Sequence, residues 1–514
     1  RGNVLYLRNI VEQEVADGRL AWLDGHWKWT GEPAMPPGLV ELIESRMGAL
    51  PTSVSDVIDA LAVAEPIALA ALTRITDPAA VEEADVRGLI TVEPVDGDMD
   101  VRLAHPLYGE VRRRRAAPTR LRRLRGLVAT ELADCEGNDD MRTVVRRAAL
   151  TLDSDLEVDA DLLVHAAKGA VWLADLPLAH RLAKAALQAG APAEANFILG
   201  HVLSWLGRGH EADAVLGAIQ QDEVTDADWG RLVFQRAQNM LFALADPAGA
   251  KKLIDDAAQT MTSRTRGCID AALTVYWALM GKPNEARRHF TDLRLRDLPA
   301  IVGAGTAMAM SVASGDAGCT AEAVAAADAA YDITQRSFDT AHMRFVIADG
   351  HIDALLQAGR IDEARDVANR LHRQGADLPG AQLLSGALMG MAALGGGCLE
   401  RACALLEPAA DAMSGDAVGW GYRYQLPRTI ALATRGLTDS ADNAFTTLQK
   451  RRHPSWRYLD YEFGLARAWV AACQGAVSEA INGALMAAET ARGNEQFAPE
   501  VMCLQTAAQF GDRS

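Results

Sequence analysis

A short turn recurs along the chain and limits the folds open to it. Residues 358–364 read AGRIDEA, and similar turns lie at residues 207–212, 281–286 and 475–480. With weaker copies included, an alanine recurs at intervals from 33 residues (179 to 212) to 41 residues (323 to 364). The recurring residues are Ala179, Ala212, Ala250, Ala286, Ala323, Ala364, Ala402, Ala441 and Ala480. A period of this length is typical of repeats that contain two helices and two turns, so we predict an all-α helical-repeat solenoid.

Each turn has the chemistry of a junction between two helices. A glycine such as Gly359 can adopt the left-handed backbone that ends a helix, and an acid such as Glu363 is favoured in the first turn of the next helix. The alanine, Ala364 in this copy, lets the two helices approach closely, and we expect it to be buried. A small residue at this place is characteristic of tetratricopeptide repeats, which residues 160–514 resemble.

Composition supports helices and restricts the partners. Hydrophobic residues make up 49% of the chain and aromatic residues only 5%, which favours closely packed helices built from Ala, Leu and Val. The formal net charge of −17 argues against a general binder of nucleic acid or anionic membranes, because such proteins need clustered positive charge. With no apolar run of about 18 residues and no signal peptide, we expect no membrane partner. Seven scattered cysteines, an odd number, favour the reducing cytoplasm.

The beginning of the chain has a different pattern, which predicts small separate domains. Apolar residues have helical spacing over residues 1–17, and residues 23–29 form a hairpin with Asp24-Gly25 as its turn. A further helix, three short helices and a second β-hairpin follow. We place the helices at residues 39–50, 54–64, 67–75 and 78–89, and the strands at residues 90–95 and 101–104. Three helices followed by a hairpin predict a winged helix.

The third helix of this winged helix is acidic. In winged helices this element usually reads the DNA major groove, but here it carries Glu82, Glu83 and Asp85 against a single Arg87. DNA phosphates would repel such a surface. We therefore favour a structural or regulatory role for the domain over DNA reading.

Four segments carry a family resemblance, in the order in which the family has them. They read GNVLYLR (2–8), DGHW (24–27), MPPGLVELI (35–43) and LAHPLY (103–108). They resemble the part of LuxR-type, MalT-like regulators that follows the ATPase core. Such regulators are signal-transduction ATPases with a P-loop domain, a winged helix, a long helical-repeat sensor and a C-terminal helix-turn-helix.

The resemblance implies a division of the chain into four parts. These are a remnant of the ATPase lid region with the short hairpin (1–35), the winged helix (36–104), an Arg-rich helical connector (105–158) and the tetratricopeptide-like repeats (159–514). The chain starts at Arg1 without a methionine, so we expect it to be a piece of a longer polypeptide.

The resemblance also implies nucleotide contact by Gly2, Asn3 and His105. His105 precedes Pro106, which suits the first position of a helix, and it resembles the winged-helix histidine that senses the β-phosphate of ADP in this superfamily. The alternative is that His105 only tethers the wing to the next helix. Val4 departs from the family, which commonly has a proline there that helps to hold the adenine.

Two parts of the family are not visible in the sequence. No G-x-x-x-x-G-K-[ST] loop is present, and no helix-turn-helix follows the repeats. ATP or ADP is therefore implied for the full-length family member and no cofactor for this piece, and DNA contact only through the missing helix-turn-helix. The 11 histidines lack metal-ligand spacing, and neither G-x-S-x-G nor H-E-x-x-H occurs, so we expect no enzyme activity and no metal.

A run of arginines follows the winged helix. It lacks interleaved aromatic residues, and its members fall on several helix faces across Pro118. Nucleic-acid binding is one interpretation; the one we favour is a connector whose arginines pair with acidic residues. The run consists of Arg112, Arg113, Arg114, Arg115, Arg120, Arg122, Arg123 and Arg125.

Aromatic residues gather in two neighbouring repeats near the end of the chain. They include Trp420, Tyr422, Tyr424, Trp456, Tyr458, Tyr461 and Phe463. Rings beside guanidinium groups suit an anionic or planar ligand. We therefore predict a site for a ligand or partner formed by Trp420, Arg423, Tyr424, Trp456, Arg457 and Tyr458. The alternative is that these rings only pack the core.

Together, these features favour the sensor portion of an ATP-dependent LuxR-type transcriptional regulator. Its repeats would bind a small-molecule or protein effector and control DNA binding, with an effector-driven homo-oligomer as one form of the response. The alternative is a stand-alone helical-repeat scaffold for protein–protein interaction.

Overall fold

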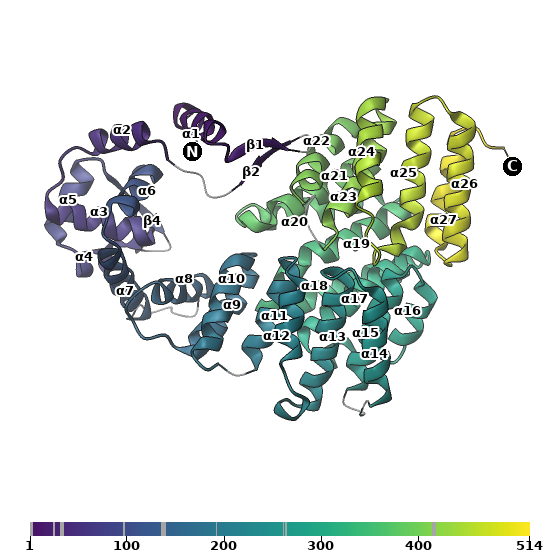
Figure 1. The fold of residues 1–514 in the computed structure, drawn as a ribbon, viewed down its shortest axis with the longest axis horizontal. Helices are drawn as coiled ribbons and strands as arrows, with labels where there is room; N and C mark the ends of the chain where they lie inside the picture. Colours follow the sequence, from purple (N-terminus) through teal and green to yellow (C-terminus); the bar gives the residue numbers. More distant parts are fainter. Residues whose placement is uncertain are drawn as a thin grey trace. The chain divides into compact units, whose positions relative to one another are not determined.

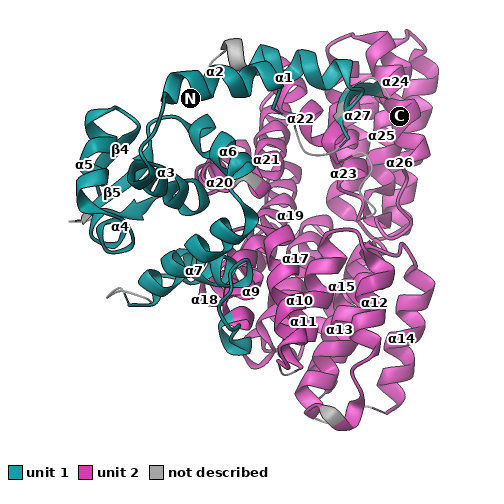
Figure 2. Ribbon diagram, turned by 60° about the vertical axis from the view of Figure 1, so that its left-hand side comes forward, with its two compact units in different colours: residues 1–162 teal, residues 163–514 magenta. Residues whose placement is uncertain are grey.

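A computed structural model describes residues 4–23, 26–30, 35–95, 98–134, 140–191, 193–260, 262, 265–413 and 418–513. The chain is largely helical (Figure 1) and forms two compact units, residues 1–162 and residues 163–514 (Figure 2). No helix in the described part of the chain is long and apolar enough to cross a membrane.

The first unit contains two small sheets among short helices. Its elements are α1 (Val4–Ala16), β1 (Leu20–Leu23), β2 (His26–Trp29), α2 (Pro37–Met47), α3 (Thr52–Ala64), β3 (Ile67–Ala68), α4 (Leu69–Ile75), α5 (Pro78–Val86), β4 (Ile90–Val95), β5 (Asp98–Leu103), α6 (Pro106–Arg115), α7 (Pro118–Asp134) and α8 (Met141–Leu152). Strands β1 and β2 form the expected first hairpin. Helices α3, α4 and α5 with β4 and β5 form the predicted winged helix around a core that includes Ile58, Leu61 and Val101.

The winged helix differs from the prediction at several bounds: the second strand covers Asp98–Leu103 instead of residues 101–104, and two further differences have a physical reason. Residues 67–68, expected to begin a helix, form β3, which pairs with β5 in a sheet of order β3-β5-β4. A two-residue strand is too short to show a strand period in the sequence. The third helix ends at Val86 instead of residue 89, because Gly88 has a φ of +66° and Leu89 N–H donates to the carbonyl of Ala84 at 3.0 Å. This is a glycine-ended helix terminus.

The arginine run pairs with acidic residues, as favoured above. Asp59, only 1% exposed, accepts from Arg112 at 2.6 Å and from Arg120 at 2.8 Å. Further ion pairs join Arg113 and Arg114 to Glu110, Arg115 to Glu44, and Arg122 to Asp155. The acidic partners neutralise much of the charge that would attract nucleic acid.

The second unit is a tetratricopeptide-like helical-repeat solenoid. One set of helices comprises α9 (Ala160–Trp172), α11 (Glu194–Trp205), α13 (Asp226–Phe242), α15 (Arg266–Leu279), α17 (Ala300–Asp316), α19 (Arg344–Gln357), α21 (Gln382–Gly395), α23 (Trp420–Thr434), α25 (Asp460–Cys473) and α27 (Phe497–Gln509). The helices alternating with them are α10 (Leu176–Gln188), α12 (Gly209–Gly217), α14 (Pro247–Gln259), α16 (Pro283–Phe290), α18 (Thr320–Arg336), α20 (Ile361–Gly375), α22 (Leu399–Ala412), α24 (Thr438–Lys450) and α26 (Val477–Gly493). Short 3₁₀ helices, among them η3 (Phe338–Met343) and η5 (Arg457–Leu459), precede some members of the first set.

The recurring alanines lie where the sequence predicts them. All nine, from Ala179 to Ala480, are 0% exposed, and each lies near the start of the second helix of a pair. Gly359, which ends α19, has a φ of +71°, so the predicted left-handed turn is confirmed. At the equivalent places of two repeats, Ala174 and Ala245 adopt left-handed values of 58° and 52° without being glycine.

Repeats far apart in the sequence also touch within this unit. Lys282 Nζ donates to Asn494 Oδ1 at 2.7 Å, and Gln496 Nε2 donates to Asp316 Oδ2 at 2.8 Å. Helix α17, apolar on nearly every side, is buried along most of its length. The solenoid therefore closes on itself, and the inner surfaces of its early and late repeats face a shared interior.

Candidate ligand-binding pocket

The interior of the solenoid contains a pocket with a volume of about 90 Å³. This is several times the roughly 10–15 Å³ that a single water molecule needs. Its lining comes from α11, α13, α15, α17, α19 and α23, with η5 and the segments that precede α19 and α23. The ring-bearing lining residues are His201, Trp205, Phe234, Phe242, Trp420, Trp456 and Tyr458.

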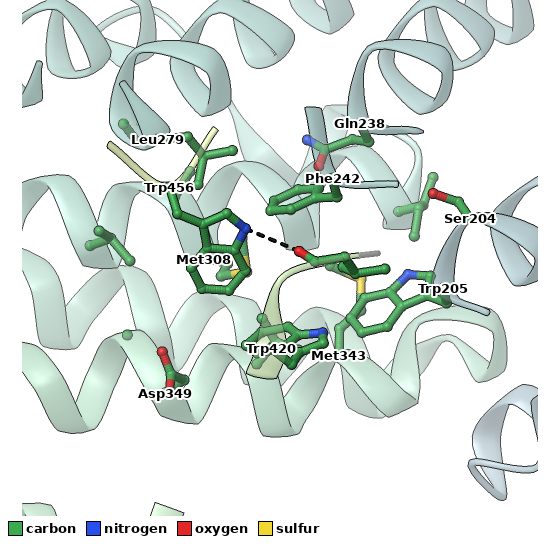
Figure 3. Close-up of a pocket in the computed structure, with 18 of the residues that line it drawn as sticks. Ser204, Trp205, Gln238, Phe242, Leu279, Met308, Met343, Asp349, Trp420 and Trp456 are labelled. Atoms are coloured by element: carbon green, nitrogen blue, oxygen red, sulfur yellow. Dashed lines mark hydrogen bonds between the residues drawn. The ribbon is translucent and has the colours of Figure 1, made fainter. Parts of the chain in front are cut away.

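Three tryptophans hold each other in place around the pocket (Figure 3). The rings of Trp420 and Trp456 meet edge to face at 5.0 Å and 82°, and Trp205 stacks on Trp420 at 6.4 Å. Trp456 Nε1 donates to the carbonyl of Val418 at 3.1 Å, which satisfies its polar atom. The pocket wall is therefore a fixed arrangement of rings.

A glycine permits this arrangement. Gly419 caps α23 with a φ of +96°, a backbone that side chains rarely adopt. A Cβ at this position would also lie 3.0 Å from Trp456 Nε1 and from the His453 ring. Gly419 thus lets Trp420 begin its helix directly against Trp456.

The residues of the predicted ligand site other than Arg423 lie in three kinds of place. Trp420, Trp456 and Tyr458 line the pocket, while Tyr424 is 0% exposed and stacks behind Trp420 at 5.9 Å. Arg457 is not among the lining residues: its side chain is 63% exposed, with Nε 3.8 Å from Asp460. Their role in ligand binding stays a prediction.

Arg423 does not offer its guanidinium group to the pocket, contrary to the sequence-based expectation. Its side chain is 1% exposed and forms ion pairs with Asp349 (2.9 Å), Glu462 (3.0 Å) and Asp353 (3.3 Å). These carboxylates come from α19 and α25, and the sequence around Arg423 gives no sign of them. The donors of Arg423 are therefore already engaged.

The carboxylates around Arg423 are in an environment that disfavours their charge. Burial raises the pKa of Asp349 above its ordinary range, although Arg423 opposes the shift. Burial likewise raises the pKa of Glu462 to about 8 and that of Asp316 to about 7. Asp349 lines the pocket and is 4% exposed, and no hydrogen bond of standard geometry reaches its buried Oδ1 among the described residues. The Tyr424 hydroxyl is a nearby donor, and its interaction with the Asp349 carboxylate favours the charged form.

Two histidines lie beside the rings. The Nε2 atoms of His201 and His342 are 3.1 Å apart, and the ring of Trp205 lies 4.7 Å from that of His342. Burial lowers the pKa of His201 to about 4, and burial followed by the charge of His201 lowers the pKa of His342. Both imidazoles are therefore neutral near pH 7. No group of three potential metal ligands is assembled in the described part of the chain.

The residues implied for nucleotide contact lie in the first unit. His105 caps α6, its Nδ1 accepting from the Leu107 N–H at 3.2 Å, as expected for a residue before a helix that starts with proline. Burial, followed by the charge of Arg46, lowers the pKa of His105. Gly2 and Asn3 lie outside the described residues, so nucleotide contact stays a prediction.

Sequence reasoning missed most of the pocket, since only Trp420, Trp456 and Tyr458 of its lining were predicted. Trp205, Phe234, Phe242 and Asp349 belong to repeats that precede the predicted cluster, Trp205 by 215 residues (420 − 205). Scarcity of aromatic residues singled out Trp420 and Trp456, and the same criterion applied to the interior faces of α11 and α13 would have added Trp205 and Phe234.

No protein-family model matches this chain, and no curated protein matches it. Among solved structures, a Rap protein complexed with competence and sporulation factor is 13% identical, with 62% of this chain and 97% of that chain covered and a TM-score of 0.44. A signal-transduction ATPase with a tetratricopeptide-repeat sensor, PH0952 from Pyrococcus horikoshii, is 10% identical over 85% of this chain and 68% of that chain, with a TM-score of 0.32. The Cut9–Hcn1 assembly gives 12% identity, coverage of 76% and 86%, and a TM-score of 0.29.

Proposed function

We propose that this chain is the effector-sensing portion of an ATP-dependent transcriptional regulator of the LuxR-type, MalT-like class, and that the effector binds in the interior pocket. The observation that carries the proposal is the pocket itself. Rings from the early and late repeats of one solenoid converge on it, together with the buried Asp349. An apolar cavity with few polar groups is the usual make-up of a small-molecule site.

The position of the pocket suits a sensor. An occupant would touch helices from α11 to α23, whose mutual contacts close the solenoid. A ligand that contacts all of these helices stabilises the closed arrangement over any more open one, by an amount set by its differential affinity. The repeats can therefore convert occupancy into a change of shape or rigidity.

A matched pair of variants tests the pocket. Ala309 lines it and is 2% exposed, whereas Ala214 lies exposed on α12. In a thermal-shift screen of small metabolites, we expect a saturable ligand whose stabilising effect is lost in Ala309→Leu, which fills the cavity, and kept in Ala214→Leu. A ligand that binds Ala309→Leu as well as the unchanged protein would place the effector site elsewhere.

The regulatory role rests on the family resemblance in residues 2–108. A winged helix after α2 supports this role, because the family also has a winged helix before its repeats. In this proposal a P-loop would hold the phosphates of ATP or ADP, with Gly2, Asn3 and His105 as further contacts, and a helix-turn-helix would bind DNA. Reading the coding sequence on both sides tests this directly. A P-loop upstream and a helix-turn-helix downstream are expected; a gene with neither would overturn the regulator and favour a stand-alone interaction scaffold.

The chain itself should not hydrolyse ATP and should bind nucleotide weakly at best, since it has no G-x-x-x-x-G-K-[ST] loop to hold phosphate and magnesium. Calorimetric titration of residues 1–514 with ATP and ADP measures the affinity. Saturable binding below about 10 μM, equivalent to roughly −7 kcal/mol, would show that a nucleotide site exists without the P-loop.

A further inference from the structure

We infer that the interior pocket takes a small organic cation, an ammonium group on an apolar body, held between the tryptophan rings and Asp349. This inference rests on the proposed function and deepens it, because it names the chemical class of the effector. The sequence predicts an anionic or planar ligand; a cation departs from the anionic alternative, since the structure places Arg423 among carboxylates and not in the pocket lining.

The rings provide faces for a cation. Trp420 and Trp456 stand nearly perpendicular, at 82°, and Trp205 lies within 20° of parallel to Trp420. Tyr458 stacks on Trp456 at 6.1 Å and adds a further ring to the lining. Several aromatic rings set at an angle to each other around one pocket are typical of sites that bind quaternary ammonium groups, because a cation is attracted to aromatic rings. A pocket of about 90 Å³ matches a compact head group better than a long chain.

The charges behind the rings also favour a cation. Arg423 supplies one positive charge to Asp349, Asp353 and Glu462, which leaves a net charge of −2 (1 − 3) when all three are ionised. Asp316 adds a fourth buried acid near this group. Asp349 Oδ1 is buried, and no hydrogen bond of standard geometry reaches it among the described residues, which is unfavourable for a carboxylate oxygen. A cation in the pocket would compensate this charge, whereas an anion would be repelled.

Protonation of the cluster makes the inference measurable. Burial raises the pKa of Asp349 and raises that of Glu462 to about 8, so Glu462 holds a proton near neutral pH. A permanent cation would favour the ionised cluster, so its affinity should rise from pH 6 to pH 9 with release of a proton. The groups that face the cluster are Asp316, Asp349, Asp353, Arg423, Tyr424, Tyr458, Tyr461 and Glu462. His201 and His342, the other ionisable groups at the pocket, are neutral over this range.

The experiment compares permanent cations with neutral molecules of the same shape. Calorimetry of residues 1–514 is carried out with choline and its isostere 3,3-dimethylbutan-1-ol, and with benzyltrimethylammonium and neopentylbenzene. We expect each cation to bind at least tenfold more tightly than its isostere and more tightly at pH 9 than at pH 6. A third arm uses a hexapeptide with one trimethyllysine; tighter binding of this peptide than of both free cations would assign the ammonium group to a protein partner and overturn the small-molecule form of the inference.

Variants separate the charge from the fold. Asp349→Asn should weaken the cations at least tenfold and leave the isosteres unchanged, whereas Asp411→Asn, whose partner Arg428 lies outside the pocket lining, should change neither. If Asp349→Asn does not fold, Trp420→Leu replaces it and should also weaken the cations at least tenfold. Equal binding of cations and isosteres, or of Asp349→Asn and the unchanged protein, would overturn the inference. A neutral or anionic screening ligand that Ala309→Leu excludes would do the same, while leaving the proposed function of the pocket intact.

Discussion

Two regions of the solenoid pack their helices in opposite ways: the turns between paired helices, and the ion cluster around Arg423 that forms the wall behind the pocket. At the turns, small apolar side chains such as Ala364 lie buried between helices that are neighbours in the sequence. Behind the pocket, Arg423 on α23 meets Asp349 on α19 and Glu462 on α25, all three buried. The turn contacts recur from repeat to repeat, whereas the ion cluster of the wall is specific to α19, α23 and α25.

The difference concerns how each region responds to change. A small apolar contact loses stability in proportion to the misfit introduced, because no charge is left behind. A buried ion cluster loses much more when one member is removed, since the remaining charges have neither water nor a partner. Such a wall is an expensive way to pack helices, which is a reason to look for its function in binding.

The largest effect is expected at Arg423. Arg423→Leu leaves the carboxylates of Asp349, Asp353 and Glu462 without their countercharge, so the free energy of unfolding should fall by about 3–5 kcal/mol. Arg457→Ala is the control, because its side chain is 63% exposed, and it should change stability by less than about 0.5 kcal/mol. Urea unfolding measures both. If both variants are as stable as the unchanged protein, the carboxylates must already be neutral in the folded state.

The next effect belongs to the turns. Ala364→Leu places three extra carbons in a contact where Ala364 is 0% exposed, which should lower the free energy of unfolding by about 1–3 kcal/mol. Arg360, one turn earlier, pairs with Glu363 at the surface, so Arg360→Ala should be nearly neutral. Equal melting temperatures for the two variants would contradict the proposed alanine contact.

The pH dependence of stability sharpens the contrast, because the acids of the turn at residues 358–364, Asp362 and Glu363, have side chains that are 84% and 54% exposed. Glu462 has a folded pKa of about 8, above its ordinary value of 4.5. Its contribution is therefore fully present below about pH 4.5 and is lost as pH rises through about 8. From pH 6.5 to pH 9, stability should fall more in the unchanged protein than in Glu462→Gln, by more than about 1 kcal/mol, since one pKa unit corresponds to about 1.4 kcal/mol.

The difference between these two proteins is the quantity to compare. Burial lowers the pKa values of His201 and His342, which changes stability in the opposite direction below about pH 6.5 in both proteins. Urea unfolding at both pH values gives the four free energies. Parallel changes in the two proteins would mean that Glu462 is already ionised at pH 6.5.

What the sequence could predict follows the same division. The turns are local, so the sequence of residues 358–364, with Gly359 and Ala364, is enough to predict one. The winged helix is predictable because its short elements follow one another in the sequence. The pocket forms because small rotations between successive repeats add up and bring α11 next to α23. No local sequence pattern predicts the total rotation. The scarcity of aromatic residues singles out Trp420 in the sequence, whereas nothing there distinguishes Asp349 from the other acids on helices.

The smallest effect tests the turns against themselves. Gly359 has a φ of +71°, and a Cβ there would meet no atom within 4 Å, so Gly359→Ala changes only the backbone strain and should lower stability by about 1 kcal/mol. Ala245 adopts the equivalent backbone with a φ of 52° and already bears that strain. Ala245→Gly relieves it, but glycine also gives the unfolded chain more freedom, so the net gain should be below about 1 kcal/mol. Opposite signs from unfolding curves would show that the left-handed backbone, and not a contact of the glycine, decides the residue at these turns. Loss of stability in both variants would instead mean that the methyl group of Ala245 packs usefully in its own repeat, and that the turns are less alike than their spacing indicates.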